Sequence, residues 1–180
     1  RGETFVTKKI IRALVKIKMG KQKKLFLGNL DSKRDWGHAQ DYVAAMWMIL
    51  QYNKPEDWVI STGKQYSVKY FVNLVAKELK MKIKWKGKGI NEIGRRADTN
   101  EIVIKIDEKY FRPCEVNSLL GDSNKANSIL GWSPSLSLED LVSDMIKSDL
   151  DLAKKFFVSQ TIEAIEKIAL FYDELDDKQW

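Results

Sequence analysis

A loop with chemically active side chains covers residues 27–42, which read LGNLDSKRDWGHAQDY. It places Arg34 and Trp36 between a short apolar run and a segment with helical apolar spacing. An arginine guanidinium can donate two parallel hydrogen bonds to an anion, and a helix N-terminus attracts negative charge. The loop therefore indicates an anion-binding site. The alternative interpretation is that Arg34 pairs with Asp31 or Asp35 while Trp36 only packs.

A second segment of this kind covers residues 110–116, which read YFRPCEV. Pro113 restricts the backbone, so we expect a rigid turn that projects Arg112 and Glu115, three residues apart. The segment therefore suggests a second binding cluster. The alternative is a surface ion pair between the two side chains, which would contribute little.

Cysteine and histidine occur once each, as Cys114 and His38. This count excludes an internal disulfide and a structural zinc site built from Cys and His ligands, and we expect no bound metal. No nucleophile signature surrounds Cys114, and a lone histidine such as His38 is more often a packed or capping residue than a catalyst. A single cysteine fits a reducing compartment, so we expect a cytoplasmic protein.

Several motifs of cofactor-dependent enzymes are missing from the sequence. No G-x-G-x-x-G follows an expected strand, and no G-x-x-x-x-G-K phosphate loop is present. None of the tyrosines, at positions 42, 52, 66, 70, 110 and 172, has a lysine four residues later. The residues themselves therefore show no catalytic base beside a nicotinamide site.

The 180 residues are 44% hydrophobic and 31% charged, with a net charge of +6. This composition can bury a core, and no apolar run approaches the ~20 residues that span a bilayer, so we expect no membrane partner. Basic residues gather near the N-terminus: Lys8, Lys9, Arg12, Lys16, Lys18, Lys21, Lys23 and Lys24. A nucleic-acid groove would add exposed aromatics or a module signature, and since neither is present we expect no nucleic-acid partner.

Helices and strands are expected to alternate along the chain, and they must position the residues described above. The pattern predicts a helix over 4–19 with Thr4 as N-cap, a strand over 24–27, and a polar loop over 31–37. A second helix is expected over 39–52. Its apolar residues should form a wide buried stripe: Tyr42, Val43, Met46, Trp47, Ile49 and Leu50.

Further along, the pattern predicts a strand at 58–63 and a helix capped by Ser67. Strands are expected at 83–85 and 102–106, joined by a mobile connection over 87–100. Three more helices should follow: one from Asp122 or Ser123 to Gly131, one over 138–157 and one over 161–175. The alternation predicts an α/β fold with at least partly parallel strand pairing.

Six stretches closely resemble the GDP-mannose 4,6-dehydratases, which belong to the extended short-chain dehydrogenase/reductases (the NAD-dependent epimerase/dehydratase family). The most specific is the string Gly-Asn-x-Asp-x-x-Arg-Asp-Trp-Gly-His-Ala at 28–39. Order and approximate spacing match from residue 1 to about residue 155. The stretches are residues 1–10, 27–42, 55–63, 110–116, 120–126 and 130–132.

The resemblance implies an α/β fold that is the C-terminal part of a Rossmann-like extended short-chain dehydrogenase, with its substrate-binding subdomain. Residues 1–155 would be the nucleotide-sugar-binding part, and residues 156–180 a helical tail of unknown role. The family's dinucleotide glycines, catalytic Thr and Glu, and Tyr-Lys pair belong to an N-terminal half that this sequence lacks. We therefore expect no catalytic residue in this chain, and no activity of the chain alone.

Matching by motif assigns binding roles to individual residues. Arg1 resembles an arginine that contacts the cofactor NADP. Val6 and Lys9 resemble residues around the guanosine of GDP-mannose. The residues that match those holding the diphosphate and the GDP ribose are Arg34, Arg112 and Glu115.

The implied reaction of the whole enzyme is the NADP-dependent conversion of GDP-mannose to GDP-4-keto-6-deoxymannose plus water, on the route to GDP-fucose. Such an enzyme would be a lyase and, at full length, a homo-oligomer (a dimer or tetramer). The alternative functions are a non-catalytic nucleotide-sugar-binding module and, further off, a basic nucleic-acid-binding domain.

Overall fold

The computed structural model describes residues 5–116, 118–155 and 162. The chain separates into two units, Arg1–Ile146 and Lys147–Trp180. Residues 138–155 are helical, in agreement with the helix predicted from residue 138, and Leu138, Val142 and Ile146 are buried. The helix predicted over 161–175 lies outside the described residues apart from Ile162, and the domain boundary at 155 stays a prediction. Across the described residues, no helix has the length and apolar content needed to cross a bilayer.

Helix α1 (Val6–Lys18) begins later than the sequence predicted. Its N-cap is Phe5, whose carbonyl accepts the first helical hydrogen bond from the N–H of Lys9 at 2.8 Å. The prediction of Thr4 as N-cap is therefore wrong, although the helix itself is confirmed. Its inward residues recur at helical spacing and are buried: Ile10, Ile11, Ala13, Leu14, Val15 and Ile17.

Four strands form the main sheet in the order β1-β6-β5-β4. Strand β1 (Leu25–Leu27) runs parallel to β6 (Ile102–Ile106), which confirms the partly parallel pairing. Strand β5 (Ile93–Arg96) is antiparallel to both β6 and β4 (Ile83–Lys86).

Strand β5 lies inside the segment that the sequence predicted to be a mobile connection. The glycine and charged residues of IGRR hide the alternation of a strand. Gly94 sits between the side chains of Ile83 and Ile104, where an added Cβ would come within 3.0 Å of Ile83. A larger residue at this position would therefore push against the side chains of the neighbouring strands. The short 3₁₀ helix η1 (Gly89–Asn91) completes the connection.

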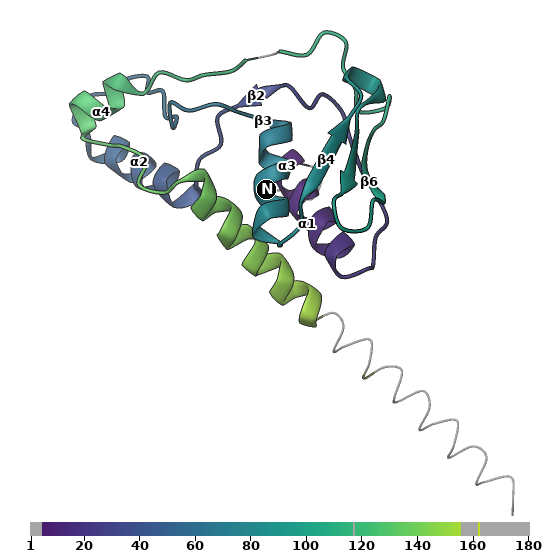
Figure 1. Cartoon of the computed structure of the whole chain (residues 1–180). Helices are drawn as coiled ribbons and strands as arrows, with labels where there is room; N and C mark the ends of the chain where they lie inside the picture. Colours follow the sequence, from purple (N-terminus) through teal and green to yellow (C-terminus); the bar gives the residue numbers. More distant parts are fainter. Residues whose placement is uncertain (1–4, 117, 156–161, 163–180) are drawn as a thin grey trace, which may run out of the picture. The chain divides into compact units, whose positions relative to one another are not determined.

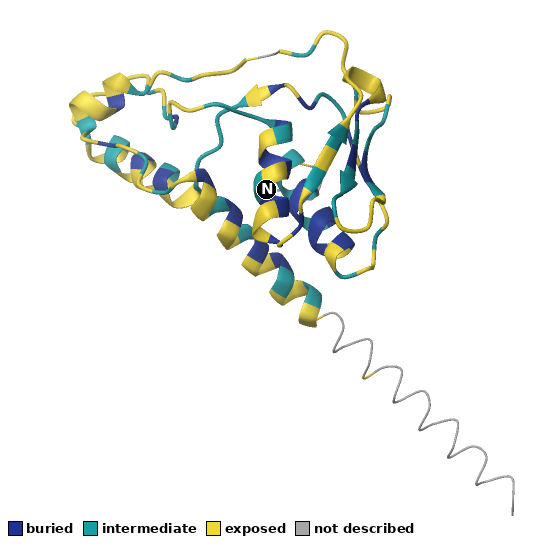
Figure 2. Ribbon diagram, viewed as in Figure 1, coloured by how far each residue is buried: buried dark blue, intermediate teal, exposed yellow. Residues whose placement is uncertain are grey.

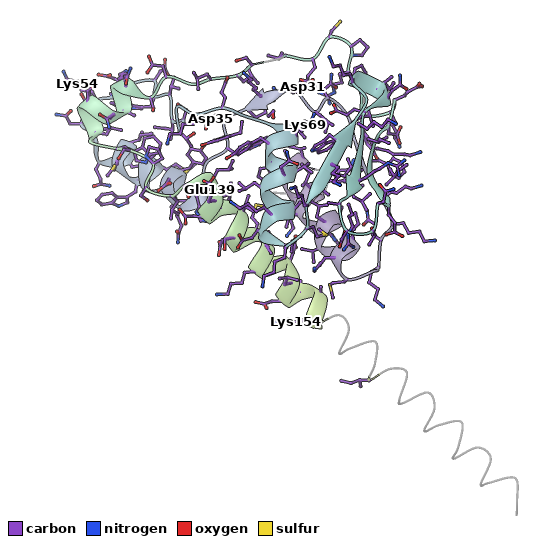
Figure 3. The ribbon with its side chains drawn as sticks, viewed as in Figure 1. Asp31, Asp35, Lys54, Lys69, Glu139 and Lys154 are labelled. Atoms are coloured by element: carbon purple, nitrogen blue, oxygen red, sulfur yellow. The ribbon has the colours of Figure 1, made fainter. Side chains whose placement is uncertain are left out.

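The core lies where α1 and α3 (Val68–Glu78) pack on each other and α1 packs on β1 (Figure 1). Phe71 of α3 and Ile104 of β6 are completely inaccessible to solvent. The predicted cap of α3 is confirmed, because the Ser67 hydroxyl accepts the N–H of Tyr70 at 3.0 Å. Lys69, labelled in Figure 3, forms an ion pair with the buried Glu92 just before β5.

A second small sheet joins β2 (Lys33–Arg34) and β3 (Tyr66–Ser67) in antiparallel pairing. Strand β2 falls in the predicted polar loop and was missed. The strand predicted at 58–63 is wrong, because residues 55–65 contain no strand. There the N–H groups of Thr62 and Gly63 donate to the carboxylate of Asp35, at 3.1 and 3.0 Å, instead of to a neighbouring strand.

Helix α2 (Ala39–Gln51) packs against α4 (Asn124–Leu130) through a cluster of Ala45, Ala126 and Trp132. Helix α4 ends as predicted at Gly131, whose φ of +68° is the left-handed cap that glycine favours.

The wide buried stripe predicted on α2 is wrong. Four of its six members are exposed, and the two others, Tyr42 and Ile49, are half-buried. The helix is buried instead through Asp41 and Ala45, on its opposite side. The exposed fractions are 62% for Val43, 62% for Met46, 63% for Trp47 and 80% for Leu50.

Asp41 connects the start of α2 to the segment after α4. Its carboxylate accepts hydrogen bonds from the Ser135 hydroxyl at 2.6 Å and the Leu136 N–H at 3.1 Å, and its carbonyl accepts the indole N–H of Trp132 at 2.8 Å. Burial opposes ionisation of Asp41, but the hydrogen bonds from Ser135 and Leu136, together with nearby His38, outweigh it and lower the pKa.

We predict that Asp41→Asn destabilises the chain by about 1–3 kcal/mol at pH 7, since an amide replaces a carboxylate that accepts two part-buried hydrogen bonds. Because the folded-state pKa is lowered, the carboxylate stabilises the fold above its unfolded pKa of about 3.9. That stabilisation is lost as the pH falls through the folded-state pKa. Thermal melts between pH 7 and pH 2.5 should show the wild type and the variant converging in acid. Exposed Asp31→Asn is the control, and a constant gap down to pH 2.5 would contradict the prediction.

Candidate functional site

Arg34 and Arg112, 78 positions apart in sequence, approach the same carboxylate. A guanidinium nitrogen of Arg34 lies 2.6 Å from one oxygen of Glu115, and a guanidinium nitrogen of Arg112 lies 3.9 Å from the other. The side chain of Glu115 is 17% exposed, whereas that of Arg112 is 78% exposed. The structure therefore brings these three predicted site residues together, with Arg112 open to solvent.

Arg34 also holds the backbone of the 110–116 segment. Its second terminal nitrogen donates to the carbonyls of Lys33 at 2.7 Å and Val116 at 2.8 Å. In the alternative interpretation Arg34 would pair with Asp31 or Asp35. Instead the Arg34 guanidinium bonds the carbonyl of Lys33 and the carboxylate of Glu115. The carboxylate of Asp35, a residue labelled in Figure 3, accepts hydrogen bonds from Thr62 and Gly63. Charge-assisted bonds of this kind are the stronger ones in proteins.

Asn29 fixes the position of Arg112, and the sequence analysis assigned it no role. Its side-chain amide donates to the carbonyl of Arg112, and its side-chain oxygen accepts the N–H of Arg112, both at 2.8 Å. The neighbouring Gly28 lets the two segments approach, because an added Cβ there would meet the carbonyl oxygen of Tyr110 at 2.0 Å. The Gly-Asn pair, which marks a turn in sequence, was the available signal.

Lys9 reaches the same region from α1. Its amino group lies 3.4 Å from the centre of the Tyr110 ring, two residues before Arg112. Burial lowers the pKa of Lys9, Asp107 opposes that shift, and Lys109 adds to it. Val6 lies half-buried one turn before Lys9. The structure thus places Lys9 next to the 110–116 segment.

The remaining candidates are Arg1, Cys114, His38 and Trp36. Arg1 lies outside the described residues. Cys114 is an exposed free thiol. His38 is the N-cap of α2: its Nδ1 accepts the N–H of Gln40 at 3.2 Å, which confirms the capping role. Trp36 packs on Phe71 with ring centres 5.0 Å apart. Within the described residues, no group of three or more His, Cys, Asp or Glu side chains could hold a metal ion.

The chemistry available at this cluster is recognition rather than proton transfer. Arg34 and Arg112 supply two cations at the Glu115 carboxylate, and Arg112 has donor groups facing solvent. Lys9 adds a third cation over the ring of Tyr110, two residues before Arg112. Such a set can hold an anion with several oxygens, while Glu115 can accept hydrogen bonds from hydroxyl groups.

The family model described as "GDP-mannose 4,6 dehydratase" matches residues 1–145. A GDP-mannose 4,6 dehydratase of Drosophila melanogaster is 51% identical over 155 residues, which are 86% of this chain and 39% of the relative. A GDP-mannose 4,6-dehydratase of Yersinia enterocolitica is 46% identical, over 91% of this chain and 49% of the relative. The chain therefore spans less than half the length of these relatives.

Solved structures share the fold at low sequence identity. The RMD protein of Pseudomonas aeruginosa, complexed with NADPH, superposes with a TM-score of 0.65 at 19% identity, over 83% of this chain and 43% of that one. The UDP-glucose 4-epimerase of Bifidobacterium longum, in complex with NAD+ and UDP, gives 0.54 at 18% identity, over 76% and 38%. The α/β fold of this chain thus matches part of each of these solved structures.

The sequence matches identify the family of this chain. Since the family model covers most of the chain and relatives from an insect and a bacterium match nearly all of it, this chain belongs to the GDP-mannose 4,6-dehydratase family of extended short-chain dehydrogenases.

Proposed function

We propose that this chain is the C-terminal, nucleotide-sugar-binding part of a GDP-mannose 4,6-dehydratase, the enzyme that converts GDP-mannose to GDP-4-keto-6-deoxymannose and water. The observation that carries the proposal is the convergence of Arg34 and Arg112 on Glu115, beside Lys9 and Tyr110. This is the arrangement that a diphosphate flanked by a ribose would need.

The three charged residues take different roles in the proposed complex. Arg112, with its exposed guanidinium, grips the diphosphate directly. Arg34 holds the segment of Glu115 and Val116 and offers its positive charge to the same phosphates. Glu115 accepts hydrogen bonds from the ribose hydroxyls through its carboxylate oxygens.

The guanosine lies toward α1 in this proposal. Lys9 and Val6 are one turn apart on that helix, so both can contact one ligand. The ring of Tyr110 beneath the Lys9 amino group offers an apolar surface next to the nucleotide. Binding energy from these remote groups would orient the mannose for reaction elsewhere in the enzyme.

NADP is the proposed cofactor, and when bound it supplies the hydride acceptor and donor of the internal redox reaction. The residue of this chain proposed to contact it is Arg1, which lies outside the described residues. We assign no proton-transfer step to the described residues. They bind and orient the nucleotide sugar, and the full-length enzyme is proposed to be a homo-oligomer.

Isothermal titration of the 180-residue chain tests the binding site. We predict similar affinities for GDP and GDP-mannose, because the proposed contacts involve the GDP portion. Arg112→Ala should weaken GDP binding about tenfold or more, since a hydrogen bond to a charged group contributes about 1.5–3 kcal/mol. Arg112→Lys should recover only part of the loss, because an ammonium lacks the planar fork.

The matched control is Arg95→Ala, which removes the same charge from strand β5. Arg95 bonds the carbonyl of Asn100, away from the cluster. Equal affinity of the wild type and the Arg112→Ala variant would defeat the site assignment. It would favour a surface ion pair between Arg112 and Glu115 instead.

Asn29 should act through Arg112, and a double-mutant cycle isolates that coupling. We expect Asn29→Ala to weaken GDP binding severalfold in the wild-type background, because the Arg112 backbone loses both hydrogen bonds to the Asn29 side chain. In the Arg112→Ala background the same change should have little further effect. Full additivity of the two losses would show that Asn29 does not position Arg112 for the ligand.

We also predict that the purified chain binds GDP-mannose without converting it when NADP+ is added. None of its tyrosines has a lysine four residues later, so the chain lacks the Tyr-Lys pair that the family uses as its catalytic base. Chromatography of the nucleotide sugars after prolonged incubation measures this directly. Accumulation of the 4-keto product by the chain alone would refute the expectation.

A further inference from the structure

Lysine occupies every second position over residues 80–88, which read KMKIKWKGK. Lys84 and Lys86 lie in strand β4. Lys82 immediately precedes the strand and continues its ladder, because its carbonyl accepts the N–H of Ala97 at 2.8 Å. All three lysines are exposed, and we call them the lysine comb. Since alternate side chains of a strand point to the same face, the comb presents its charges in one row.

The residues that alternate with the lysine comb lie on the other face of β4, toward α3. The indole N–H of Trp85 donates to the side-chain oxygen of Asn73 at 2.9 Å, and the amino group of Lys69 lies 5.1 Å from the centre of its ring. Ile83 and Trp85 are nevertheless only half-buried, and Figure 2 shows half-buried and exposed residues alternating along β4. One face of the strand is therefore cationic, and the other is apolar.

Acidic side chains do not neutralise the lysine comb within the part of the chain that the structure describes. Each ion pair found there uses a cation outside the comb. The residue directly opposite Lys84 is Arg95 of β5, and Lys86 lies in one row with Ile93 and Lys105. Like charges directly opposite each other destabilise a sheet. A negatively charged partner would offset this repulsion.

Strand β4 is an edge strand, because the sheet order is β1-β6-β5-β4. On its outer side, its backbone N–H and C=O groups bond no other backbone group of the described residues. An open edge is a template for a further strand, and lysines on an edge repel unsuitable strands. The lysine comb therefore makes the edge selective: it disfavours neutral and basic strands and favours an acidic one.

The spacing of the lysine comb matches that of an extended peptide with acidic residues at alternate positions. A strand rises about 3.3 Å per residue, so alternate side chains are about 6.6 Å apart on both strands. Each carboxylate of such a peptide would lie opposite one lysine, and the apolar residues between them would cover Ile83 and Trp85.

We propose that the open edge of β4 is a docking site for an acidic peptide segment of a partner protein. The segment adds to the sheet as a further strand, with acidic residues facing the lysine comb and apolar residues on the other face. Backbone hydrogen bonds supply part of the affinity in this mode of recognition, and the alternating side chains supply the specificity. The proposal does not depend on the proposed GDP site.

The geometry favours a peptide over a nucleic acid as the occupant. A peptide strand satisfies both the N–H and the C=O groups of the open edge, whereas a phosphate can accept hydrogen bonds only from the N–H groups. Sequence-independent binding of single strands also uses exposed aromatic rings on which bases stack. The aromatic residue of β4, Trp85, is instead held by Asn73 and Lys69 of α3.

Fluorescence polarisation with the 180-residue chain tests the docking. The probe is a short labelled peptide of alternating glutamate and valine with both ends blocked. We expect saturable binding that weakens about fivefold or more between about 50 and 500 mM NaCl, because salt screens exposed charges. A peptide of the same composition, with its glutamates and valines in two separate blocks, should bind about fivefold more weakly or less, because it cannot match both faces of β4.

Methylation of the peptide backbone separates strand addition from attraction between charges alone. In a strand, the N–H groups of successive residues point to opposite edges. A probe that is N-methylated only at its valines keeps one edge free, so it should bind within about threefold of the parent peptide. A probe N-methylated at every residue has the same charge but no free edge, and it should bind about tenfold more weakly or less.

Charge reversal tests whether the peptide binds at β4. Lys84→Glu combined with Lys86→Glu should weaken binding of the alternating peptide about tenfold or more, because carboxylates would then face carboxylates. The matched control is Lys16→Glu combined with Lys18→Glu, which makes the same change of charge at two exposed positions of α1 and should leave binding within about twofold. Thermal melts should show the β4 variant no less stable than the wild type, since an acidic residue at position 84 would lie opposite Arg95.

Four outcomes would overturn the proposal. The first is no saturable binding of the alternating peptide at low salt, since the lysine comb would then only keep other strands away. The second is undiminished binding by the charge-reversed β4 variant. The third is equal binding of the fully methylated probe, which would show attraction between charges without strand addition. The fourth is tighter binding of a single-stranded oligonucleotide of equal charge that the β4 variant loses, since nucleic acid would then be the occupant.

Discussion

The candidate site depends on the parallel pairing of β1 with β6. Because parallel strands end at the same edge of a sheet, the segment after Leu27 and the segment after Ile106 emerge side by side. The N–H of Asp107 continues the ladder by donating to the carbonyl of Leu27 at 2.9 Å. Gly28 then permits the close approach of Tyr110, and Asn29 binds both backbone groups of Arg112. Without this pairing, the segments that carry Arg34 and Glu115 would not be held within hydrogen-bonding distance of each other.

Electrostatics distinguishes the two ends of α2. At its start, His38 caps the helix and Asp41 binds the segment after α4 through hydrogen bonds. The carboxylate near the helix N-terminus is also favoured by the helix dipole. Along the rest of the helix charge is absent, although the chain as a whole is basic. Helix α1, by contrast, carries five basic residues, and one of them, Lys9, lies beside the segment where an anionic nucleotide is proposed to bind.

Much of the fold could be predicted from residue spacing. The helices around Leu14 and Phe71, and the strands at Ile83 and Ile104, carry strong periodic signals that tertiary packing only reinforces. Strand β5 was missed because Gly94 stands where the alternating pattern of a strand would have an apolar side chain. At this position the side chains of Ile83 and Ile104, on the two neighbouring strands, leave little room for a larger residue. The strand expected at 58–63 failed because the carboxylate of Asp35 takes the backbone N–H groups that a ladder would need. Neither effect is visible in the local sequence.

By itself, the sequence determined the residue types of the candidate site, the family resemblance and the amphipathic pattern of the core helices. These properties depend on short-range spacing and on motifs such as residues 28–39. The tertiary structure decided which charges meet. The sequence left Arg34 free to pair with Asp31 or Asp35, whereas the fold pairs it with Glu115, 81 residues away. The structure also decided that the apolar residues of α2 divide between a covered and an open face. Burial is set by what packs against a helix, and periodicity records only which side chains are apolar.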